Sequence, residues 1–224
     1  MATAPKPLKV LFHLHPQLDT LDFAGPMEIL SQAIHASTAS LPKPVRVFEP
    51  TVTAVTEQVS SGQHCIFQRH IPIEDAYAKL ADFDVLVIPG GGSGGVIEGQ
   101  TEPLHLIRAY CALETEEGKT RTLLSVCTGS LFLAEAGALK GLTATTHPFY
   151  DEKFRQLCEG QATVVKERYV VNKVNEKGLR VITSGGVSCG MDASMWLVNE
   201  VAGRESAEKV LDLIQYAWRQ GVVL

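Results

Sequence analysis

The sequence predicts a doubly wound α/β domain, with a mostly parallel sheet and helices on both of its faces. Two apolar runs, residues 84–88 and 121–126, are nearly continuous, which is typical of parallel strands covered on both sides. Segments with strand and helix patterns alternate along the chain, as they do in this class of fold. Ligands of such sheets bind beyond the carboxyl ends of the strands, so we expect the functional residues directly after each strand.

The length of 224 residues fits one core, and we expect a single domain over residues 1–224 with a flexible N-terminal stretch, 1–7. The most linker-like stretch, 37–44, is short enough to be a surface loop. Expected strands span 9–15, 45–55, 64–68, 84–88, 121–126, 142–146, 169–174 and 179–183. Expected helices span 22–35, 103–117, 129–139, 148–158, 189–201 and 205–219.

The composition excludes several classes of protein. A net charge of −5 leaves no basic surplus for nucleic acid or anionic lipid. No apolar run reaches the ~18 residues of a membrane span, and the N-terminus lacks an apolar signal core. The five cysteines are scattered, which suits reduced thiols better than a disulfide framework, and no paired spacing for zinc occurs. We therefore expect a cytoplasmic protein with no nucleic-acid or membrane partner.

Cys127 is the main candidate for chemistry. It follows the buried run 121–126 and precedes a predicted helix, which is where a nucleophile elbow places its reactive side chain. The N–H groups of a helix start favour a thiolate and can stabilise an anion on a substrate. Gly129 allows a close turn, whereas Ser125 stands where the elbow has its leading glycine. A buried structural cysteine is the common alternative, and we prefer it for Cys65, Cys111 and Cys158.

For other candidate residues, a structural role is an alternative to a functional one. Asp22 is either a helix N-cap ahead of Pro26 or an acid/base group, and Asp19 competes with it. His147 either orients a substrate or caps the helix that Pro148 begins. Cys189 opens a late helix, where it lines a pocket or acts as a resolving thiol.

Two further patterns carry less information. Gly90, Gly92 and Gly95 satisfy the dinucleotide-binding pattern G-x-G-x-x-G, but this loop follows an internal strand, and we expect an oxyanion or substrate loop instead. His13 and His15 alternate along a strand and can share one face. Because no third ligand is near them in sequence, we expect packing or loop hydrogen bonds, and no metal site.

The segments 84–91 and 125–130 resemble the DJ-1/PfpI superfamily, whose flavodoxin-like sheet carries a cysteine on such an elbow. Three more segments, 21–26, 144–147 and 183–192, resemble the isonitrile hydratase branch and the sensor-type domain of some AraC-family regulators. The likeness runs from about Leu8 to Gly203 with the order and spacing kept. It implies a homodimer and no organic or metal cofactor.

Carried over by position, the resemblance implies Cys127 as the nucleophile and Asp22 as its acid/base partner. Thr128 lies beside the cysteine, and the amides of Gly91 and Thr128 form an anion hole, with Gly92 in the adjoining loop. The protease-like and glyoxalase-like branches have a histidine after the cysteine or elsewhere in a triad. Thr128 stands there in this chain, so we do not expect peptidase activity.

The implied reaction is hydration of a small isonitrile to an N-substituted formamide. It needs a nucleophilic thiolate and a carboxyl group that begins protonated, and such a pair shares its protons. Two alternatives remain open: a non-enzymatic domain that senses a metabolite or oxidant, and glyoxalase-like action on reactive aldehydes. After Gly203 only about twenty residues follow, so we expect no helix-turn-helix DNA reader within the chain.

Overall fold

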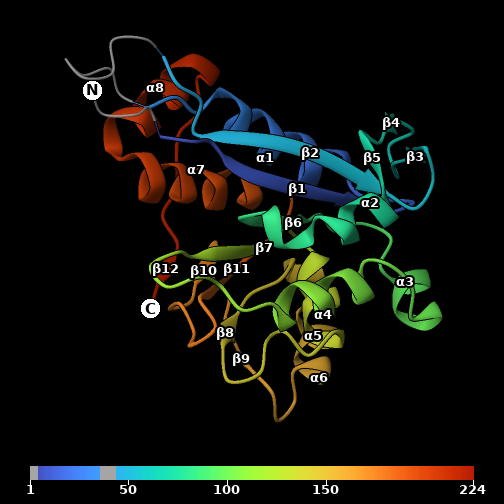
Figure 1. Cartoon of the computed structure of the whole chain (residues 1–224). Coiled ribbons are helices and arrows are strands. Elements are labelled where there is room, and N and C mark those ends of the chain that lie inside the picture. The colour runs from blue at the N-terminus through green and yellow to red at the C-terminus, as the bar shows by residue number, and fades with distance from the viewer. Residues whose placement is uncertain (1–4, 36–43) are drawn as a thin grey trace.

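A computed structural model describes residues 5–35 and 44–224, and its centre is an eight-stranded sheet (Figure 1). Five parallel strands form the body of the sheet in the order β2-β1-β6-β7-β11. They are β1 (Leu8–Leu14), β2 (Phe48–Ala54), β6 (Val85–Ile88), β7 (Arg121–Ser125) and β11 (Leu179–Ser184). Numbered along the chain, this is the order 2-1-3-4-5 of flavodoxin-like sheets, whose direction of winding reverses between β1 and β6.

Short strands complete the two edges of the sheet. β5 (Ile71–Pro72) pairs with β2, while β10 (Tyr169–Val171) runs antiparallel to β11 and is followed outward by β12 (Val222–Val223). The predicted strands 169–174 and 179–183 therefore are neighbours, as expected. Two small sheets lie outside the main one: β3 (Gln58–Ser60) with β4 (Ile66–Gln68), and β8 (Thr143–Ala144) with β9 (Thr163–Val164).

Helices cover both faces of the sheet, as Figure 1 shows. On one side lie α1 (Thr20–Gln32), α7 (Cys189–Ala202) and α8 (Arg204–Ile214). On the other lie α2 (Ile73–Ala78), α4 (Leu104–Ala112), α5 (Gly129–Glu135) and α6 (Asp151–Leu157), with α3 (Gly94–Gly99) in the loop after β6. Short 3₁₀ turns, Leu80–Asp82 and Pro148–Tyr150, connect elements.

Side chains of β1 divide between two hydrophobic clusters, one on each face. Phe12 and Leu14 pack into the cluster that contains Trp196 of α7, whereas Leu11 packs into the cluster that contains Phe132 of α5. This alternation follows from the two-residue repeat of a strand. It explains why the apolar run of β1 is nearly continuous, and it turns His13 toward the α5 side together with Leu11.

Several expected helices are shorter than predicted. The helix expected over 103–117 ends at Ala112, and the one expected over 205–219 ends at Ile214, where Gln215 adopts a left-handed φ of 51°. A helix also forms at Gly94–Gly99, where the sequence predicted only a loop before Pro103. Its three glycines disfavour a helix locally, which is why helix propensity did not predict it. The linker-like stretch 37–44 lies outside the described residues except for Pro44.

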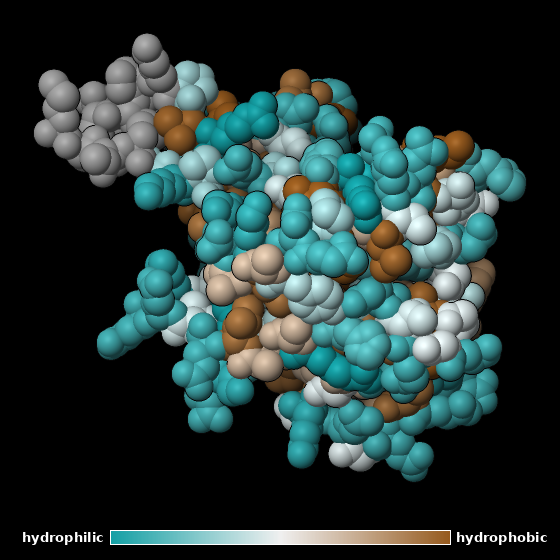
Figure 2. Space-filling model, turned by 45° about the vertical axis from the view of Figure 1, so that its right-hand side comes forward, coloured by the Kyte–Doolittle hydropathy of each residue, from teal (hydrophilic) through white to brown (hydrophobic). Residues whose placement is uncertain are grey.

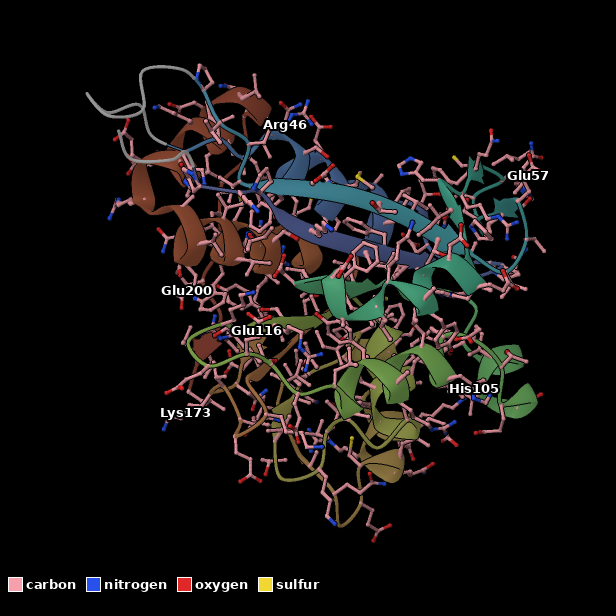
Figure 3. The ribbon with its side chains drawn as sticks, in the orientation of Figure 1. Arg46, Glu57, His105, Glu116, Lys173 and Glu200 are labelled. Carbon is pink, nitrogen blue, oxygen red and sulfur yellow. The ribbon has the colours of Figure 1, made fainter. Side chains whose placement is uncertain are left out.

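Most charged and polar side chains lie on the outside of the molecule. Figure 3 labels six exposed ones: Arg46, Glu57, His105, Glu116, Lys173 and Glu200. In the face drawn in Figure 2, hydrophilic residues predominate and hydrophobic ones form small groups. None of the helices that the structure describes is long and apolar enough to cross a bilayer.

Candidate active site

Cys127 lies on a sharp turn between β7 and α5. Its φ of 58° is in the left-handed region, which costs a non-glycine residue about 1 kcal/mol. Hydrogen bonds hold this strained backbone: the Cys127 N–H donates to the carbonyls of Ser184 (3.1 Å) and Gly185 (3.0 Å). The turn is close because Gly129 has no side chain; a Cβ there would lie 2.4 Å from the Ile88 carbonyl oxygen. The backbone between β7 and α5 thus has the geometry of the predicted elbow.

Asp22 reaches the elbow from the first turn of α1. Its side chain is fully buried, and Oδ2 accepts a hydrogen bond from the Gly90 N–H at 3.0 Å. Oδ1 has no hydrogen-bond partner among the described residues. The N-cap of α1 is Asp19, whose Oδ1 accepts from the Leu21 N–H at 3.1 Å. The capping interpretation therefore belongs to Asp19, and Asp22 is left as a buried carboxyl group.

Burial, and next the charge of Asp19, raise the pKa of Asp22 to about 8, although the Gly90 N–H and the Cys127 thiol act in the opposite direction. A carboxyl group that stays protonated near neutral pH matches the second requirement of the expected chemistry.

The Cys127 thiol differs from the expectation of a thiolate at neutral pH. Burial, and next the negative charge of Asp22, raise its pKa to about 12. The N–H groups of Val187 and Thr128 act in the opposite direction but do not outweigh these two effects. Only 6% of the cysteine surface is exposed. The helix start was expected to favour ionisation, but α5 has only seven residues, and a neighbouring carboxylate counteracts it.

Thr128 joins the elbow to the glycine loop after β6. Its hydroxyl accepts from the Gly91 N–H at 2.8 Å and donates to the Gly91 carbonyl at 3.1 Å. The Gly92 N–H donates to the Gln17 carbonyl at 2.8 Å. The Gly91 amide, which was expected at an anion hole with that of Thr128, and the Gly92 amide of the adjoining loop are thus both engaged within the protein. The amides directed at the sulfur are those of Thr128 and Val187.

Comparison with known proteins identifies the family of the chain. The sequence profile of the DJ-1/PfpI family matches residues 8–200. The chain belongs to the DJ-1/PfpI family. A relative from Pseudomonas putida named isonitrile hydratase is 32% identical over 210 residues, which cover 94% of this chain and 79% of the relative.

Solved structures of DJ-1/PfpI proteins share the fold. A THiJ/PfpI family protein from Pseudomonas syringae superposes with a TM-score of 0.71 at 22% identity, covering 96% of this chain and 77% of its own. Drosophila melanogaster DJ-1beta gives a TM-score of 0.71 at 20% identity, covering 95% and 100% respectively. At these identities the likeness establishes the flavodoxin-like fold alone.

His147 lies next to the elbow of this DJ-1/PfpI domain but has a structural contact. Its Nδ1 accepts from the Phe149 N–H at 3.1 Å, which caps the 3₁₀ turn Pro148–Tyr150. The ring also packs on Gly186, where a Cβ would lie 2.5 Å from the ring carbon Cδ2. The capping alternative is therefore present, and a role in substrate orientation stays a prediction.

Sequence reasoning missed three residues that shape the elbow. The Val187 N–H lowers the pKa of the Cys127 thiol, and Thr146 Oγ1 donates to the Cys127 carbonyl at 3.3 Å. Arg168 binds the fully buried Asp192 at the start of α7. Thr146, Val187 and Asp192 belonged to segments that carried the family likeness, but nothing in the sequence indicated a role for Arg168.

A cavity of about 600 Å³ lies beside this site, not within it. His13, His15, Gly92 and Val96 are among its lining residues, whereas Cys127 and Asp22 are not. An isolated antiparallel bridge joins Leu18 and Gly91, which neighbour the lining residues Gln17 and Gly92 in sequence. Within residues 5–35 and 44–224, no cluster of three or more metal-ligating side chains occurs.

Proposed function

We propose that the chain is a cysteine-dependent hydratase that converts a small isonitrile to an N-substituted formamide. The observation that carries the proposal is the burial of one thiol and one carboxyl group side by side, with the pKa of each raised by burial. Such a pair exchanges protons with a bound molecule without help from solvent. The 32% identical relative named isonitrile hydratase supports this choice of substrate class.

In the proposed reaction the Cys127–Asp22 pair carries one proton and one negative charge, and the proton passes from the Cys127 thiol to Asp22 as the substrate binds. Asp22 donates its proton to the terminal carbon of the isonitrile while the Cys127 sulfur attacks the same carbon, giving a thioimidate. The Asp22 carboxylate then takes a proton from water as the oxygen adds to this carbon, and it passes the proton to nitrogen. It next takes the hydroxyl proton of the adduct while the C–S bond breaks. The formamide leaves, and the pair regains its starting protonation.

The reaction also needs a stabilised sulfur anion and a carboxyl oxygen that is free to transfer protons, and the elbow and its neighbours provide both. The N–H groups of Val187 and Thr128 that face the sulfur stabilise the negative charge on it when it is attacking and leaving. The hydrogen bond from Gly90 fixes one oxygen of Asp22 and leaves Oδ1 for proton transfer. We also propose that the protein is a cytoplasmic homodimer, as the family suggests.

Turnover of cyclohexyl isocyanide to N-cyclohexylformamide tests the proposal. Wild type is expected to be active, whereas Cys127→Ala and Asp22→Asn lose at least two orders of magnitude in kcat. Two controls are matched to these variants. Cys111→Ala removes a cysteine on α4, and Asp19→Asn keeps a residue suited to the N-cap; both are expected to retain turnover.

An inactive wild type would contradict the hydratase proposal. Consumption of methylglyoxal by the same protein would then support the glyoxalase-like alternative. If neither substrate is consumed, a metabolite-sensing domain is favoured, and saturable binding without turnover is its expected signature.

A further inference from the structure

The cavity beside the Cys127–Asp22 pair opens at the carboxyl ends of β1 and β2. Its rim includes Val55, which is 57% exposed. Its inner wall includes His13, Val59 and Val96, all buried. At about 600 Å³ it is within the size range of small-molecule sites, which are mostly apolar with a few polar groups.

The cavity also lies where this class of fold binds ligands. The strand order reverses between β1 and β6, and the cavity is lined by the end of β1 and by the glycine-containing loop after β6. In doubly wound sheets this switch point leaves a crevice between loops that diverge in opposite directions. Cys127 itself follows β7, and neither it nor Asp22 is among the residues that line the cavity.

His13 is the polar group that lacks a partner in this cavity. It is 1% exposed, and neither ring nitrogen has a hydrogen-bond partner among the described residues. Its neighbour His15 differs, because its Nδ1 lies 3.0 Å from the Pro16 carbonyl and its Nε2 lies 3.2 Å from the Pro89 carbonyl. Leaving a buried imidazole unpaired is unfavourable, and a ligand that pairs with it removes this penalty.

The charge around His13 defines the class of ligand. Burial, and next the neighbouring His15, lower the pKa of His13 to about 3, although its own backbone carbonyl opposes this effect. The ring is therefore neutral at physiological pH and offers one donor and one acceptor nitrogen. No lysine or arginine is among the described residues that line the cavity. Its charged residue is Glu102, whose oxygens accept from the Tyr77 hydroxyl (2.5 Å) and the Leu106 N–H (3.0 Å).

We propose that this cavity is a second binding site, for an uncharged and largely apolar molecule that carries one hydroxyl group bonded to His13. A hydroxyl matches a neutral imidazole because each of them can donate and accept one hydrogen bond. A carboxylate or phosphate is excluded by Glu102 and by the lack of a cation. The site does not depend on the proposed hydratase chemistry, because its residues and those of the Cys127–Asp22 pair do not overlap.

Phenol is a suitable probe, with toluene as the matched hydrocarbon that lacks the hydroxyl group. In ¹⁵N-labelled protein, phenol is expected to shift the ring nitrogen resonances of His13 in a saturable manner, and toluene to bind more weakly. His13→Phe keeps the ring shape and removes the partner, so phenol affinity falls about tenfold while toluene affinity is unchanged. Val55→Trp at the exposed rim narrows the opening and weakens both.

Two controls separate this site from the elbow and from misfolding. Cys127→Ala is expected to bind phenol as wild type does, whatever the outcome of the isonitrile assay. His13→Phe is expected to unfold at or above the wild-type temperature, since it replaces an unpaired buried polar group. The proposal is overturned if phenol leaves the His13 resonances unmoved, if folded His13→Phe binds phenol as tightly as wild type, or if Cys127→Ala loses binding.

Discussion

The hydroxyl group of Thr128 bonds to both backbone polar groups of Gly91, to its N–H at 2.8 Å and to its carbonyl at 3.1 Å. The Thr128 side chain thereby makes the two hydrogen bonds that the backbone of a neighbouring strand would make with Gly91. These bonds hold the loop after β6 against the elbow. Because Asp22 binds Gly90 in the same loop, three segments far apart in sequence are fixed in one place.

Removal of the Thr128 hydroxyl should loosen this contact. Thr128→Val keeps the shape of the side chain but leaves the Gly91 N–H without its partner, so we expect a loss of about 2 kcal/mol in the free energy of unfolding. Thr128→Ser keeps the hydroxyl and should lose about 1 kcal/mol for the missing methyl group. Urea denaturation of both variants measures the difference, and equal losses would contradict the role of the hydroxyl.

Turnover should depend on the first ionisation of the Cys127–Asp22 pair. The reactive form carries one proton, and it becomes populated as pH rises toward 8, where Asp22 ionises. Below that pH the rate is expected to fall about tenfold per pH unit. Asp19, whose charge raises the pKa of Asp22, provides the control: in Asp19→Asn the profile should move to lower pH. A flat rate between pH 6 and 9 would rule out this assignment.

Stability should also depend on Asp22. Its pKa is raised from 3.8 to about 8 in the folded protein, so the folded state retains a proton that the unfolded state loses above pH 4. The free energy of unfolding therefore decreases as pH rises from about 4 to about 8, by up to about 1.4 kcal/mol per pH unit from this group, and then levels off. Denaturation of wild type and Asp22→Asn at pH 5, 6, 7 and 8 tests this; parallel curves would contradict it.

The Cys127 thiol should react slowly with alkylating agents. Its pKa is raised to about 12, chiefly by burial and by the charge of Asp22. In a Cys65→Ser background, which removes the exposed cysteine, iodoacetamide at pH 8 should modify Cys127 only slowly. Adding Asp22→Asn removes the nearby charge and should speed the reaction several-fold. Mass spectrometry of the digested protein gives both rates, and a faster reaction in the presence of Asp22 would refute the coupling.

The ion pair of Arg168 with the buried Asp192 should be important for stability. Asp192 is fully buried and also accepts from the Tyr216 hydroxyl (3.1 Å) and the Arg219 N–H (2.8 Å), so it ties the segment after α8 to α7. Asp192→Asn should cost roughly 3 kcal/mol in the free energy of unfolding. Tyr216→Phe removes hydrogen bonds of a hydroxyl group but no charge, so it should lower the free energy of unfolding by only about 1 kcal/mol. Equal effects of the two would argue against a special role of the charge.

The sequence predicted the frame of the fold well where the pattern was strong. The buried strands 84–88 and 121–126 and the elbow between β7 and α5 were predicted from their apolar runs and the following turn. The antiparallel edge strand β10 was expected beside β11. The short helix Gly94–Gly99 was missed because its glycines disfavour a helix, and helix ends were placed too far along the chain.

The electrostatics of the site could not be predicted in the same way. The placement of Cys127 at a helix start indicated a thiolate, but the pKa depends on how deeply the sulfur is buried and how near Asp22 comes, and neither is encoded locally. Asp19 and Asp22 were both candidates for the cap, and only their side-chain contacts, with the Leu21 N–H for Asp19 and the Gly90 N–H for Asp22, distinguish them. The unpaired state of His13 likewise depends on contacts across the sheet.

The edge strand β5 has a consequence for the behaviour of the protein at high concentration. It is two residues long, and the second is Pro72, which has no N–H group to offer to another strand. A strand from a second molecule therefore finds no continuous row of donors and acceptors along this side of the sheet. A short edge strand that contains proline disfavours pairing with the sheet of another molecule, and so protects the chain from edge-to-edge aggregation.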